Sequence, residues 1–456
     1  MYRLLALVRK HAIAILLCLL WLIVWQMHLL NSWLELSPPE EVAAFILLLT
    51  ATLWITEALP LYISSLGVLL LSVLLLHPLL DTSNVPKEVF YQAFFGDITL
   101  LFMGGFVLSA LLNKYGIAVR IANRVIRRTG TRPSYFLLGI ILIAAFLSMW
   151  MSNTATAAMM FAIVGPIVLV LPDTDPFTKA LGLAIPFACN IGGLGTPIGT
   201  PPNAIAIEYL QQAGISISFA QWIGIGVPAM LILGALLWAI LLKLYPAQQA
   251  SIPIEQEKNT TPLSGKQYMV LALFLLTILG WLFSGQLAVT TGTVGLCLVI
   301  ASFGLRLLDT RDFKNISWDI LFMLGGGLCL GVGLQKSGLT ATIAVAIPMG
   351  SPFWVILITL IILAACMTTF MSNTATANLL IPVAISLPNN ELILAIAISL
   401  MCSTSMALPV STPPNAIAFG SGLVGVPDIF KSGMIMTLLA LIVIILMCIL
   451  YVPLFI

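Results

Sequence analysis

The sequence predicts an all-α integral membrane protein with 11 transmembrane helices and two re-entrant helical hairpins arranged as an inverted-topology repeat. Of the 456 residues, 60% are hydrophobic and only 8% are charged. Long apolar runs recur along the chain, and one motif of seven residues occurs twice. The composition and the runs indicate membrane helices, and the repeated motif indicates a duplication.

Apolar runs define the expected spanning segments. Soluble domains carry roughly a quarter charged residues, far more than this chain. A helix that crosses a bilayer needs about 20 apolar residues. Several runs reach or approach this length: Phe45 to Leu59, Leu61 to Leu80, Ala220 to Leu242 and Met269 to Phe283. Membrane barrels alternate polar and apolar residues, which these runs do not, so we expect helices.

Charged residues indicate the orientation of the chain. Arg3, Arg9 and Lys10 precede an apolar run over residues 12–30 that is too long for a signal peptide, and we interpret it as a first helix with a cytoplasmic N-terminus. Six basic residues and no acidic residue lie within 114–132, which predicts a cytoplasmic segment. We expect a multi-pass protein of the cell inner membrane with an external C-terminus. The acidic residues of the predicted external loops are Glu35, Glu40, Glu41, Asp81 and Glu88.

The cysteines and histidines do not indicate a metal centre. The three histidines, His11, His28 and His77, lack metal-ligand spacing. The seven cysteines lie inside apolar runs and are interpreted as small buried hydrophobic residues. They are Cys18, Cys189, Cys297, Cys329, Cys366, Cys402 and Cys448. We expect no cofactor and no transition metal.

Three pairs of similar segments show that the chain is a duplication. Residues 151–157 and 371–377 both read Met-Ser-Asn-Thr-Ala-Thr-Ala. Residues 200–206 and 412–418 both read Thr-Pro-Pro-Asn-Ala-Ile-Ala. Before each motif, a third pair aligns without gaps. It matches Asp97, Ile98, Gly104, Lys114 and Gly116 to Asp319, Ile320, Gly326, Lys336 and Gly338.

The number of spans between the two motifs predicts an inverted repeat. Five spans lie near 178–210, 220–245, 268–285, 288–305 and 318–335. Because five is odd, the second motif enters the membrane from the face opposite to the first. Five spans in each repeat and an unpaired first helix give the expected total of 11.

Each Ser-Asn-Thr motif lies in the middle of a segment bounded by prolines, Pro133 to Pro172 and Pro352 to Pro388. Each segment is about twice the length of a spanning helix, so we expect a helical hairpin with the motif at its turn. A plain pair of helices that cross the whole membrane is the alternative. The paired prolines Pro201-Pro202 and Pro413-Pro414 predict two broken helices downstream. Broken helices in symmetric positions indicate a transporter binding site.

Neutral oxygen atoms around each motif are suited to a weakly held hard cation such as sodium. Ser148 and Ser152 are four residues apart and share a helix face. With Asn153 and the Gly199 region they form one candidate cation site. The symmetry-related candidate site combines Thr368, Ser372, Asn373 and the Ser411 region.

The apolar sequence resumes directly after each motif, which predicts a helix capped by Ser, Asn or Thr. A helix N-terminus binds anions. Two such termini are suited to a ligand with two carboxylates. The motif segments contain no lysine or arginine, so bound sodium and helix dipoles would supply the positive potential.

Structural roles are the alternative interpretation of several polar residues. An isolated Ser or Thr in an apolar helix usually bonds to its own turn or to a neighbouring helix, but symmetric repetition of the motif favours a functional role. Near predicted helix ends, a structural role is favoured for Asp97, Asp319, Lys114 and Lys336. Glu57 precedes Pro60 at a helix end, where a structural role is favoured over a proton site.

The paired Ser-Asn-Thr at 152–154 and 372–374 and the paired Thr-Pro-Pro-Asn at 200–203 and 412–415 resemble the divalent anion:sodium symporter (DASS) family. The resemblance covers essentially the whole chain. It implies an elevator-type homodimer in which a transport domain slides across a scaffold. It implies two sodium sites, formed by Ser148, Ser152, Asn153 and Gly199, and by Thr368, Ser372, Asn373 and Ser411. The implied substrate-binding residues are Ser152, Asn153, Thr154, Thr200, Ser372, Asn373, Thr374, Thr412 and Pro413.

The resemblance implies secondary active transport, with sodium-coupled symport of a C4 dicarboxylate such as succinate, malate or fumarate into the cytoplasm. The same-fold alternatives are a dicarboxylate exchanger and a carrier of citrate, tartrate or sulfate. An enzyme would need an acid-base or nucleophilic constellation, which the sequence does not offer. A channel would not require two alternating gates or an inverted duplication. The expected partners are the substrate, sodium ions, membrane lipid and a second copy of the chain, without nucleic acid.

The repeat also predicts a division of the chain. We expect residues 1–132 to form N-terminal scaffold helices and 133–245 to form the first part of a transport domain, with the first hairpin and broken helix. Residues 246–350 would form a linker and the second scaffold part. Residues 351–456 would form the second part of the transport domain.

Overall fold

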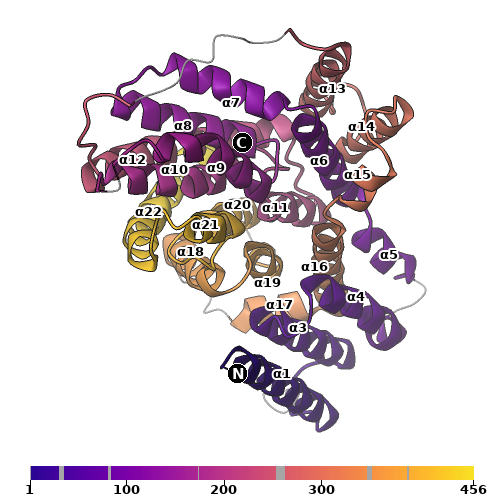
Figure 1. The fold of residues 1–456 in the computed structure, drawn as a ribbon. Coiled ribbons are helices and arrows are strands. Elements are labelled where there is room, and N and C mark those ends of the chain that lie inside the picture. Colours follow the sequence, from indigo (N-terminus) through magenta and orange to yellow (C-terminus); the bar gives the residue numbers. More distant parts are fainter. Residues whose placement is uncertain are drawn as a thin grey trace. The chain divides into compact units, whose positions relative to one another are not determined.

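In the residues that the computed structural model describes, all regular secondary structure is helical (Figure 1). These are residues 2–29, 35–80, 84–172, 174–252, 262–346, 352–387 and 390–455. Asp81, Pro388 and residues 253–261 of the predicted linker lie outside them. The described chain divides into two compact units, each assembled from three separate stretches of sequence.

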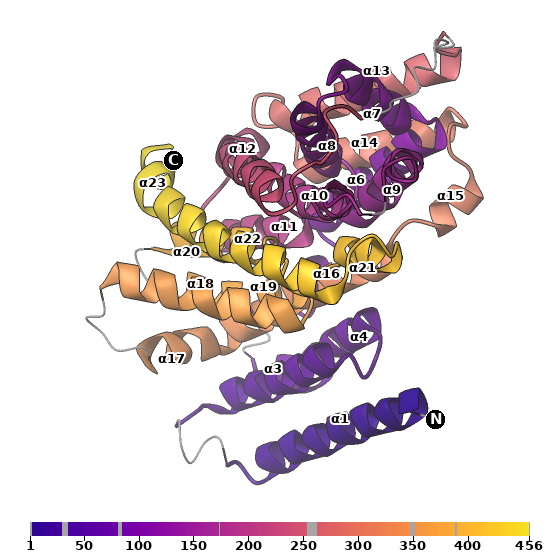
Figure 2. The same cartoon turned by 60° about the vertical axis from the view of Figure 1, so that its left-hand side comes forward.

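The first unit contains residues 1–99, 205–216 and 317–399. Its N-terminal elements are α1 (Tyr2–Gln26), α3 (Pro38–Thr56), α4 (Leu61–Leu71), η1 (Ser72–Leu76), η2 (His77–Leu79) and α5 (Glu88–Phe94). Its later elements are α16 (Trp318–Ser337), α17 (Leu339–Ala346), α18 (Phe353–Phe370), α19 (Asn373–Ile385) and most of α20 (Glu391–Cys402). Helices α1 and α3 lie side by side (Figure 2).

The second unit contains residues 100–204, 217–316 and 400–456. Its first elements are most of α6 (Asp97–Lys114), α7 (Ile117–Arg128), α8 (Pro133–Ser148), α9 (Asn153–Val168), α10 (Phe177–Gly192), η3 (Gly193–Gly195) and the first turn of α11 (Pro201–Gln212). The next are α12 (Phe219–Leu244), α13 (Gly265–Leu282), α14 (Thr291–Gly304) and α15 (Thr310–Lys314). The last are α21 (Pro413–Gly420), α22 (Val426–Leu446), η4 (Met447–Tyr451) and α23 (Val452–Phe455), and the final three form one rod in Figure 2.

Local sequence explains where several of these helices begin. Helix α12 starts after Ser218, whose hydroxyl accepts a hydrogen bond from the Gln221 N–H at 3.1 Å, while the Gln221 side chain accepts one from the Ser218 N–H at 2.8 Å. The same reciprocal pair joins Ser264 and Gln267 before α13. These capping boxes satisfy N–H groups that have no partner within the helix.

Nine helical segments within the described residues are long and apolar enough to cross a membrane. They are Pro38–Thr56, Leu61–Leu79, Glu88–Lys114, Phe177–Gly195, Phe219–Leu244, Gly265–Leu282, Trp318–Ser337, Phe353–Phe370 and Val426–Phe455. Shorter apolar helices include α8 and α9, each of 16 residues. Such a helix extends only about 24 Å, which is less than the hydrocarbon core of about 30 Å. The total of 11 spans therefore stays a prediction.

Helix α16 forms the centre of the first unit and packs against α3, α4, α5 and α19. Consecutive glycines allow these close contacts. A Cβ atom on Gly326 would lie 2.3 Å from the Cβ of Ser65 in α4. A Cβ atom on Gly327 would lie 2.0 Å from the amide carbon of Asn378 in α19. Larger residues at either glycine would push the neighbouring helix away.

Helix α10 has the corresponding place in the second unit, where it packs against α8, α9, α12 and α21 (Figures 1 and 2). Nearly all of its side chains are buried. At its C-terminal end, a Cβ atom on Gly192 would lie 2.3 Å from the carbonyl oxygen of Ala145. This close approach brings the end of α10 against the last turn of α8, just before the first motif.

The expectation that all seven cysteines are buried is wrong. Cys297 and Cys366 are exposed and Cys18 is half-buried, while the other four are buried. All seven are free thiols. An apolar run in a membrane protein includes the face that contacts lipid, so apolar surroundings in the sequence do not imply burial within the protein.

The charged residues for which a structural role was favoured lie at helix ends. Asp97 and Lys114 are in the first and last turns of α6, and Asp319 and Lys336 have the same places in α16. Acidic side chains at N-terminal ends and basic ones at C-terminal ends interact favourably with the helix dipole. Glu57 caps the C-terminus of α3 in a left-handed conformation with φ of 45°.

Candidate binding site

The first Ser-Asn-Thr motif lies where α8 ends and α9 begins. Helix α8 ends at Ser148, and α9 starts at Asn153 after a turn of four residues. The negative end of the α8 dipole and the positive end of the α9 dipole therefore meet at the motif. The turn between α8 and α9 therefore lies beside two helix ends. The C-terminal end of α8 attracts cations, and the N-terminal end of α9 attracts anions.

Ser152 caps helix α9, as the sequence predicts for a residue of this motif. Its hydroxyl accepts a hydrogen bond from the Ala155 N–H at 3.2 Å. Asn153 and Thr154 follow as the first helical residues, and the Thr154 side chain is exposed. The N–H groups of a first helical turn have no partner within the helix and can bind an anion.

Ser148 and Asn153 form the closest side-chain pair of the motif. The Ser148 hydroxyl donates a hydrogen bond to Asn153 Oδ1 at 2.6 Å, and Ser148 is fully buried. A Cβ atom on Gly193 would lie 3.1 Å from Asn153 Oδ1 and 3.2 Å from the Gly199 carbonyl oxygen. The structure thus brings Ser148, Asn153 and Gly199 together beside Gly193. Ser152 lies at the adjoining helix start with its hydroxyl bonded to the backbone.

The predicted break after α10 is present, and Asn203 holds its two sides together. The chain leaves the helix at Gly193, passes through a 3-10 turn and resumes as a helix at Pro201. Asn203 Nδ2 donates to the carbonyl oxygens of Gly193 at 2.9 Å and Thr196 at 2.8 Å. The Thr196 hydroxyl donates to the Met149 carbonyl at 2.5 Å, which ties the break to the motif turn. Buried carbonyls released by the break thereby regain partners.

The second motif repeats these local contacts within the first unit. The Thr368 hydroxyl donates to Asn373 Oδ1 at 2.7 Å, and Thr368 is fully buried. Ser372 caps α19 by accepting a hydrogen bond from the Ala375 N–H at 3.1 Å. Thr374, which follows Asn373, is buried with 5% exposure. The two motifs therefore share their hydrogen bonds as well as their sequence.

The second predicted break lies between α20 and α21 and contains Ser411, Thr412 and Pro413. Helix α20 ends at Cys402 and α21 begins at Pro413, whose side chain is exposed. Asn415 Nδ2 donates to the carbonyls of Met406 and Leu408, each at 3.0 Å. The Ser411 hydroxyl accepts a hydrogen bond from the Leu408 N–H at 3.2 Å. Asn415 therefore has the same role here as Asn203 in the first break.

Within the second unit, polar side chains join the two breaks. Asn190 Nδ2, near the end of α10, donates to Thr412 Oγ1 at 3.1 Å and to Asn415 Oδ1 at 3.3 Å. In the opposite direction, the Ser403 hydroxyl donates to Thr200 Oγ1 at 3.4 Å. Thr200 and Thr412 are thus each held by a side chain from the segment around the other break.

Sequence reasoning missed the residues that organise the breaks. Asn203 and Asn415 belong to the repeated Thr-Pro-Pro-Asn segment, and this repetition was a signal that could have identified them. Asn190 and Ser403 carry no such signal because they belong to no repeated motif. Their importance follows from contacts between segments more than 200 residues apart.

A comparison with protein families matches residues 51–401 to the family described as CitMHS, citrate transporter. The matched range contains both Ser-Asn-Thr motifs and the first break.

Curated bacterial proteins resemble the chain over most of its length. The sodium-dependent dicarboxylate transporter SdcS of Staphylococcus saprophyticus is 33% identical, over 91% of this chain and 87% of that protein. The protein of the same name from Staphylococcus aureus strain USA300 is 32% identical, over 87% of this chain and 83% of that protein. A Haemophilus influenzae protein named only as an uncharacterized transporter is 34% identical, over 90% of this chain and 92% of that protein.

Two solved structures share the fold at low sequence identity. The Alcanivorax borkumensis YdaH transporter has a TM-score of 0.56 at 13% identity, over 87% of this chain and 99% of that chain. Neisseria gonorrhoeae MtrF has a TM-score of 0.51 at 12% identity, over 81% of this chain and 85% of that chain. At these identities, the likeness concerns the fold alone.

Proposed function

Because the chain belongs to the citrate transporter (CitMHS) family and is a secondary transporter of the DASS type rather than an enzyme, we propose that it carries a C4 dicarboxylate into the cytoplasm together with sodium ions. The observation that carries this proposal is the matching hydroxyl–amide pair of the two motifs. Ser148 donates to Asn153 at 2.6 Å, and Thr368 donates to Asn373 at 2.7 Å.

The first sodium site would use the oxygen atoms gathered near Gly193. The Ser148 hydroxyl, the Asn153 amide oxygen and the Gly199 carbonyl supply neutral oxygen ligands, which hard cations prefer. Ser152 lies at the adjoining start of α9. Unwound carbonyls and helix C-terminal ends coordinate sodium in other broken-helix transporters. The Ser148 end of α8 and the break after Gly193 provide both features.

The second sodium site would use Thr368, Ser372 and Asn373 with the Ser411 carbonyl. Support comes from the repeated hydrogen bonds of the second motif, which prepare the same amide oxygen beside a buried hydroxyl. The proposal assigns Ser411 to this site by the internal symmetry of the sequence.

Substrate carboxylates would bind at the N-termini of the helices that follow the motifs. Ser152 and Ser372 cap α9 and α19 and leave the N–H groups of the next residues for an anion. Asn153, Thr154, Asn373 and Thr374 belong to these two helix starts. Thr200, Thr412 and Pro413 would contact the substrate from the broken helices. Sodium bound nearby would compensate for the absence of lysine and arginine in the motif segments.

The proposal includes an elevator mechanism in a homodimer of the inner membrane. Residues 133–245 and 351–456 would form the moving transport domain, and residues 1–132 and 246–350 would form the scaffold and linker. The motifs would be the tips of two re-entrant hairpins that enter from opposite faces as an inverted repeat. The 11 spans would place the N-terminus in the cytoplasm and the C-terminus outside. The length of 16 residues for α8 and for α9 supports the re-entrant form of the first hairpin.

Transport by purified protein in liposomes tests the coupling. An inward sodium gradient should drive accumulation of labelled succinate above its external concentration, whereas an equal potassium gradient should not. Protein-free liposomes give the background. Uptake that is equal in potassium contradicts sodium symport. Uptake that requires a dicarboxylate inside the liposomes indicates an exchanger instead.

Citrate is the second candidate substrate, because the matching family is described as citrate transporters. Competition in the same liposomes separates the two candidates. Unlabelled succinate, malate or fumarate should abolish succinate uptake, and citrate at the same concentration should leave most of it. Stronger inhibition by citrate than by succinate would identify a citrate carrier. Tartrate and sulfate complete the panel.

A further inference from the structure

Helix α7 has one apolar face and one strongly basic face. Its buried residues are Ile117, Ala118, Ala122 and Ile126. This face packs against α8 and α9. The other face carries Arg124, Arg127 and Arg128, all exposed, and the half-buried Arg120. Because α8 and α9 cover the apolar face, the basic face is the one that remains at the surface of the protein.

The basic face of α7 forms one wall of a groove of about 680 Å³. The other wall comes from the residues before and within the first turns of α13, Pro262, Leu263 and Tyr268. Within the described part of the chain, none of the residues that line the groove is acidic. Val119 and Tyr268 add exposed apolar surface, with 38% and 60% exposure. The groove therefore combines a high positive charge with apolar surface at its edge.

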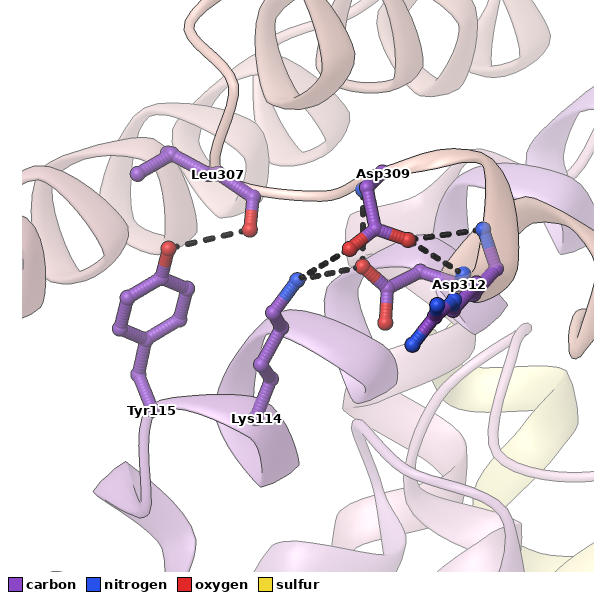
Figure 3. Close-up of polar contacts among 6 residues, drawn as sticks. Lys114, Tyr115, Leu307, Asp309 and Asp312 are labelled. Carbon is purple, nitrogen blue, oxygen red and sulfur yellow. Dashed lines mark hydrogen bonds and ion pairs between the residues drawn. The ribbon is translucent and has the colours of Figure 1, made fainter.

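Two carboxylates, those of Asp309 and Asp312, lie near the turn between α6 and α7, and both already have partners (Figure 3). Asp312 accepts from Lys114 Nζ at 2.5 Å, and Asp309 lies 3.6 Å from the same nitrogen. Asp309 also accepts from the N–H groups of Arg311 and Asp312. Lys114 is absent from the groove lining, so this ion pair does not involve the arginines that line the groove.

The groove lies where two candidate membrane spans end. The span Glu88–Lys114 ends two residues before Gly116, and the span Gly265–Leu282 begins within the groove wall. A membrane crossed by these two spans would have its lipid headgroups at the level of the groove. Guanidinium groups bind phosphate through paired hydrogen bonds, and tyrosine side chains prefer the membrane interface.

We propose that this groove binds the phosphate headgroup of an anionic phospholipid. Arginines of α7 hold the phosphate, while Val119, Leu263 and the Tyr268 ring contact the glycerol and upper acyl chains. The apolar edge and the ends of two spans favour a lipid over a soluble phosphate. The site is separate from the Ser-Asn-Thr motifs and does not depend on the identity of the transported anion.

Lipid binding by the purified full-length protein tests the proposal. Native mass spectrometry in detergent should detect bound phosphatidylglycerol in preference to phosphatidylcholine. Replacing Arg124→Gln and Arg128→Gln together should weaken phosphatidylglycerol binding on the order of fivefold for each arginine, or about 25-fold. The matched control is Lys243→Gln with Lys431→Gln, which removes two exposed positive charges outside the groove. This control should bind phosphatidylglycerol as the wild type does.

Three outcomes would overturn the proposal. One is equal loss of phosphatidylglycerol in the arginine and lysine variants, which would mean that net charge alone attracts the lipid. Another is equal binding of phosphatidylcholine by the wild type. The third is displacement of the lipid by inorganic phosphate or glycerol 3-phosphate at equal concentration, which would identify a site for soluble phosphate. If the glutamine variant does not fold, Arg124→Lys with Arg128→Lys keeps the charge. It should still bind several-fold more weakly, and unchanged binding would contradict the headgroup contact.

Discussion

The two Ser-Asn-Thr motifs have the same local structure, but their following helices have different surroundings. In both, a buried hydroxyl donates to the motif asparagine, and the motif serine caps the next helix. The residue after the repeated seven differs, because Ala158 in α9 corresponds to Asn378 in α19. Ala158 is exposed, whereas Asn378 is fully buried against Gly327 of α16. The motif thus determines its own hydrogen bonds, while burial depends on the helix packed beside it.

The breaks that follow the motifs extend this comparison. Asn203 and Asn415 each donate two hydrogen bonds to carbonyls of their own break, at 2.8–3.0 Å. Both asparagines are fully buried. The same contact thus occurs in both breaks, although the two breaks belong to different parts of the chain. This indicates that the asparagine stabilises the interruption of the helix itself.

Replacing Asn203→Ala or Asn415→Ala should have the largest effect. Each substitution leaves two carbonyls without their donor, both buried for Asn203 and one buried for Asn415, at a cost of about 1–3 kcal/mol for each buried carbonyl. We expect a clearly lower Tm in detergent and loss of transport in liposomes for both variants. The control is Asn113→Ala, an exposed asparagine in α6. A lower Tm for only one of the two variants would show that the breaks are not equivalent.

Replacing Asn153→Ala or Asn373→Ala should have the next largest effect, on sodium dependence. Each variant loses an amide oxygen of a proposed sodium site and the acceptor of Ser148 or Thr368. An interaction with a charged group contributes about 1.5–3 kcal/mol, so the sodium concentration for half-maximal succinate uptake should rise about 10- to 100-fold. Sodium titration of initial uptake rates measures this shift. Unchanged sodium dependence in both variants would refute the assignment, and a change in only one would make the two motifs functionally unequal.

Features with local causes could be predicted from the sequence, and features that depend on tertiary contacts could not. The apolar run after each motif predicts a cap by Ser, Asn or Thr, and Ser152 and Ser372 provide it. Paired prolines predict the breaks before Pro201 and Pro413. The link from Asn190 to Thr412 joins residues 222 positions apart and has no local signal. Exposure is equally dependent on packing. An identical motif precedes the exposed Ala158 and the buried Asn378, and the exposed cysteines lie in runs as apolar as the buried ones.

Replacing Asn378→Ala should raise Tm slightly, whereas the substitutions in the breaks lower it. Within the described structure, neither polar atom of the Asn378 side chain has a hydrogen-bond partner, although both are buried. Burial of an unpaired amide costs about 1–3 kcal/mol, and a small cavity offsets part of the gain on its removal. We expect Tm to rise by about 1–2 °C, measured by thermal unfolding in detergent. Ala158→Asn is the matched control on the exposed side and should leave Tm unchanged. A fall in Tm for Asn378→Ala would show that the amide has a partner.

The turns that follow α6 and α16, called corners here, are a second pair of regions related by the repeat. Lys114 and Lys336 occupy aligned positions in these helices. The first corner is joined to α15 by the ion pair from Lys114 to Asp312 and Asp309 (Figure 3). The second is joined to α3 by a hydrogen bond from the Thr342 hydroxyl to Glu40. The same corner is therefore secured by charge in one repeat and by a hydroxyl in the other.

Replacing Asp309→Asn should have the smallest effect, and pH should reveal it. The N–H groups of Arg311 and Asp312, with Lys114 nearby, hold the pKa of the Asp309 carboxyl below its ordinary value. A lowered pKa stabilises the folded protein above the unfolded aspartate pKa of about 3.9, and this contribution is lost as pH falls through the folded pKa. The wild type should unfold about 1 °C higher than Asp309→Asn at pH 7, because exposed ion pairs contribute little. This difference should shrink as pH falls below about 4. Since asparagine also caps helices, a difference that persists unchanged in acid would mean that Asp309 acts through its shape rather than its charge.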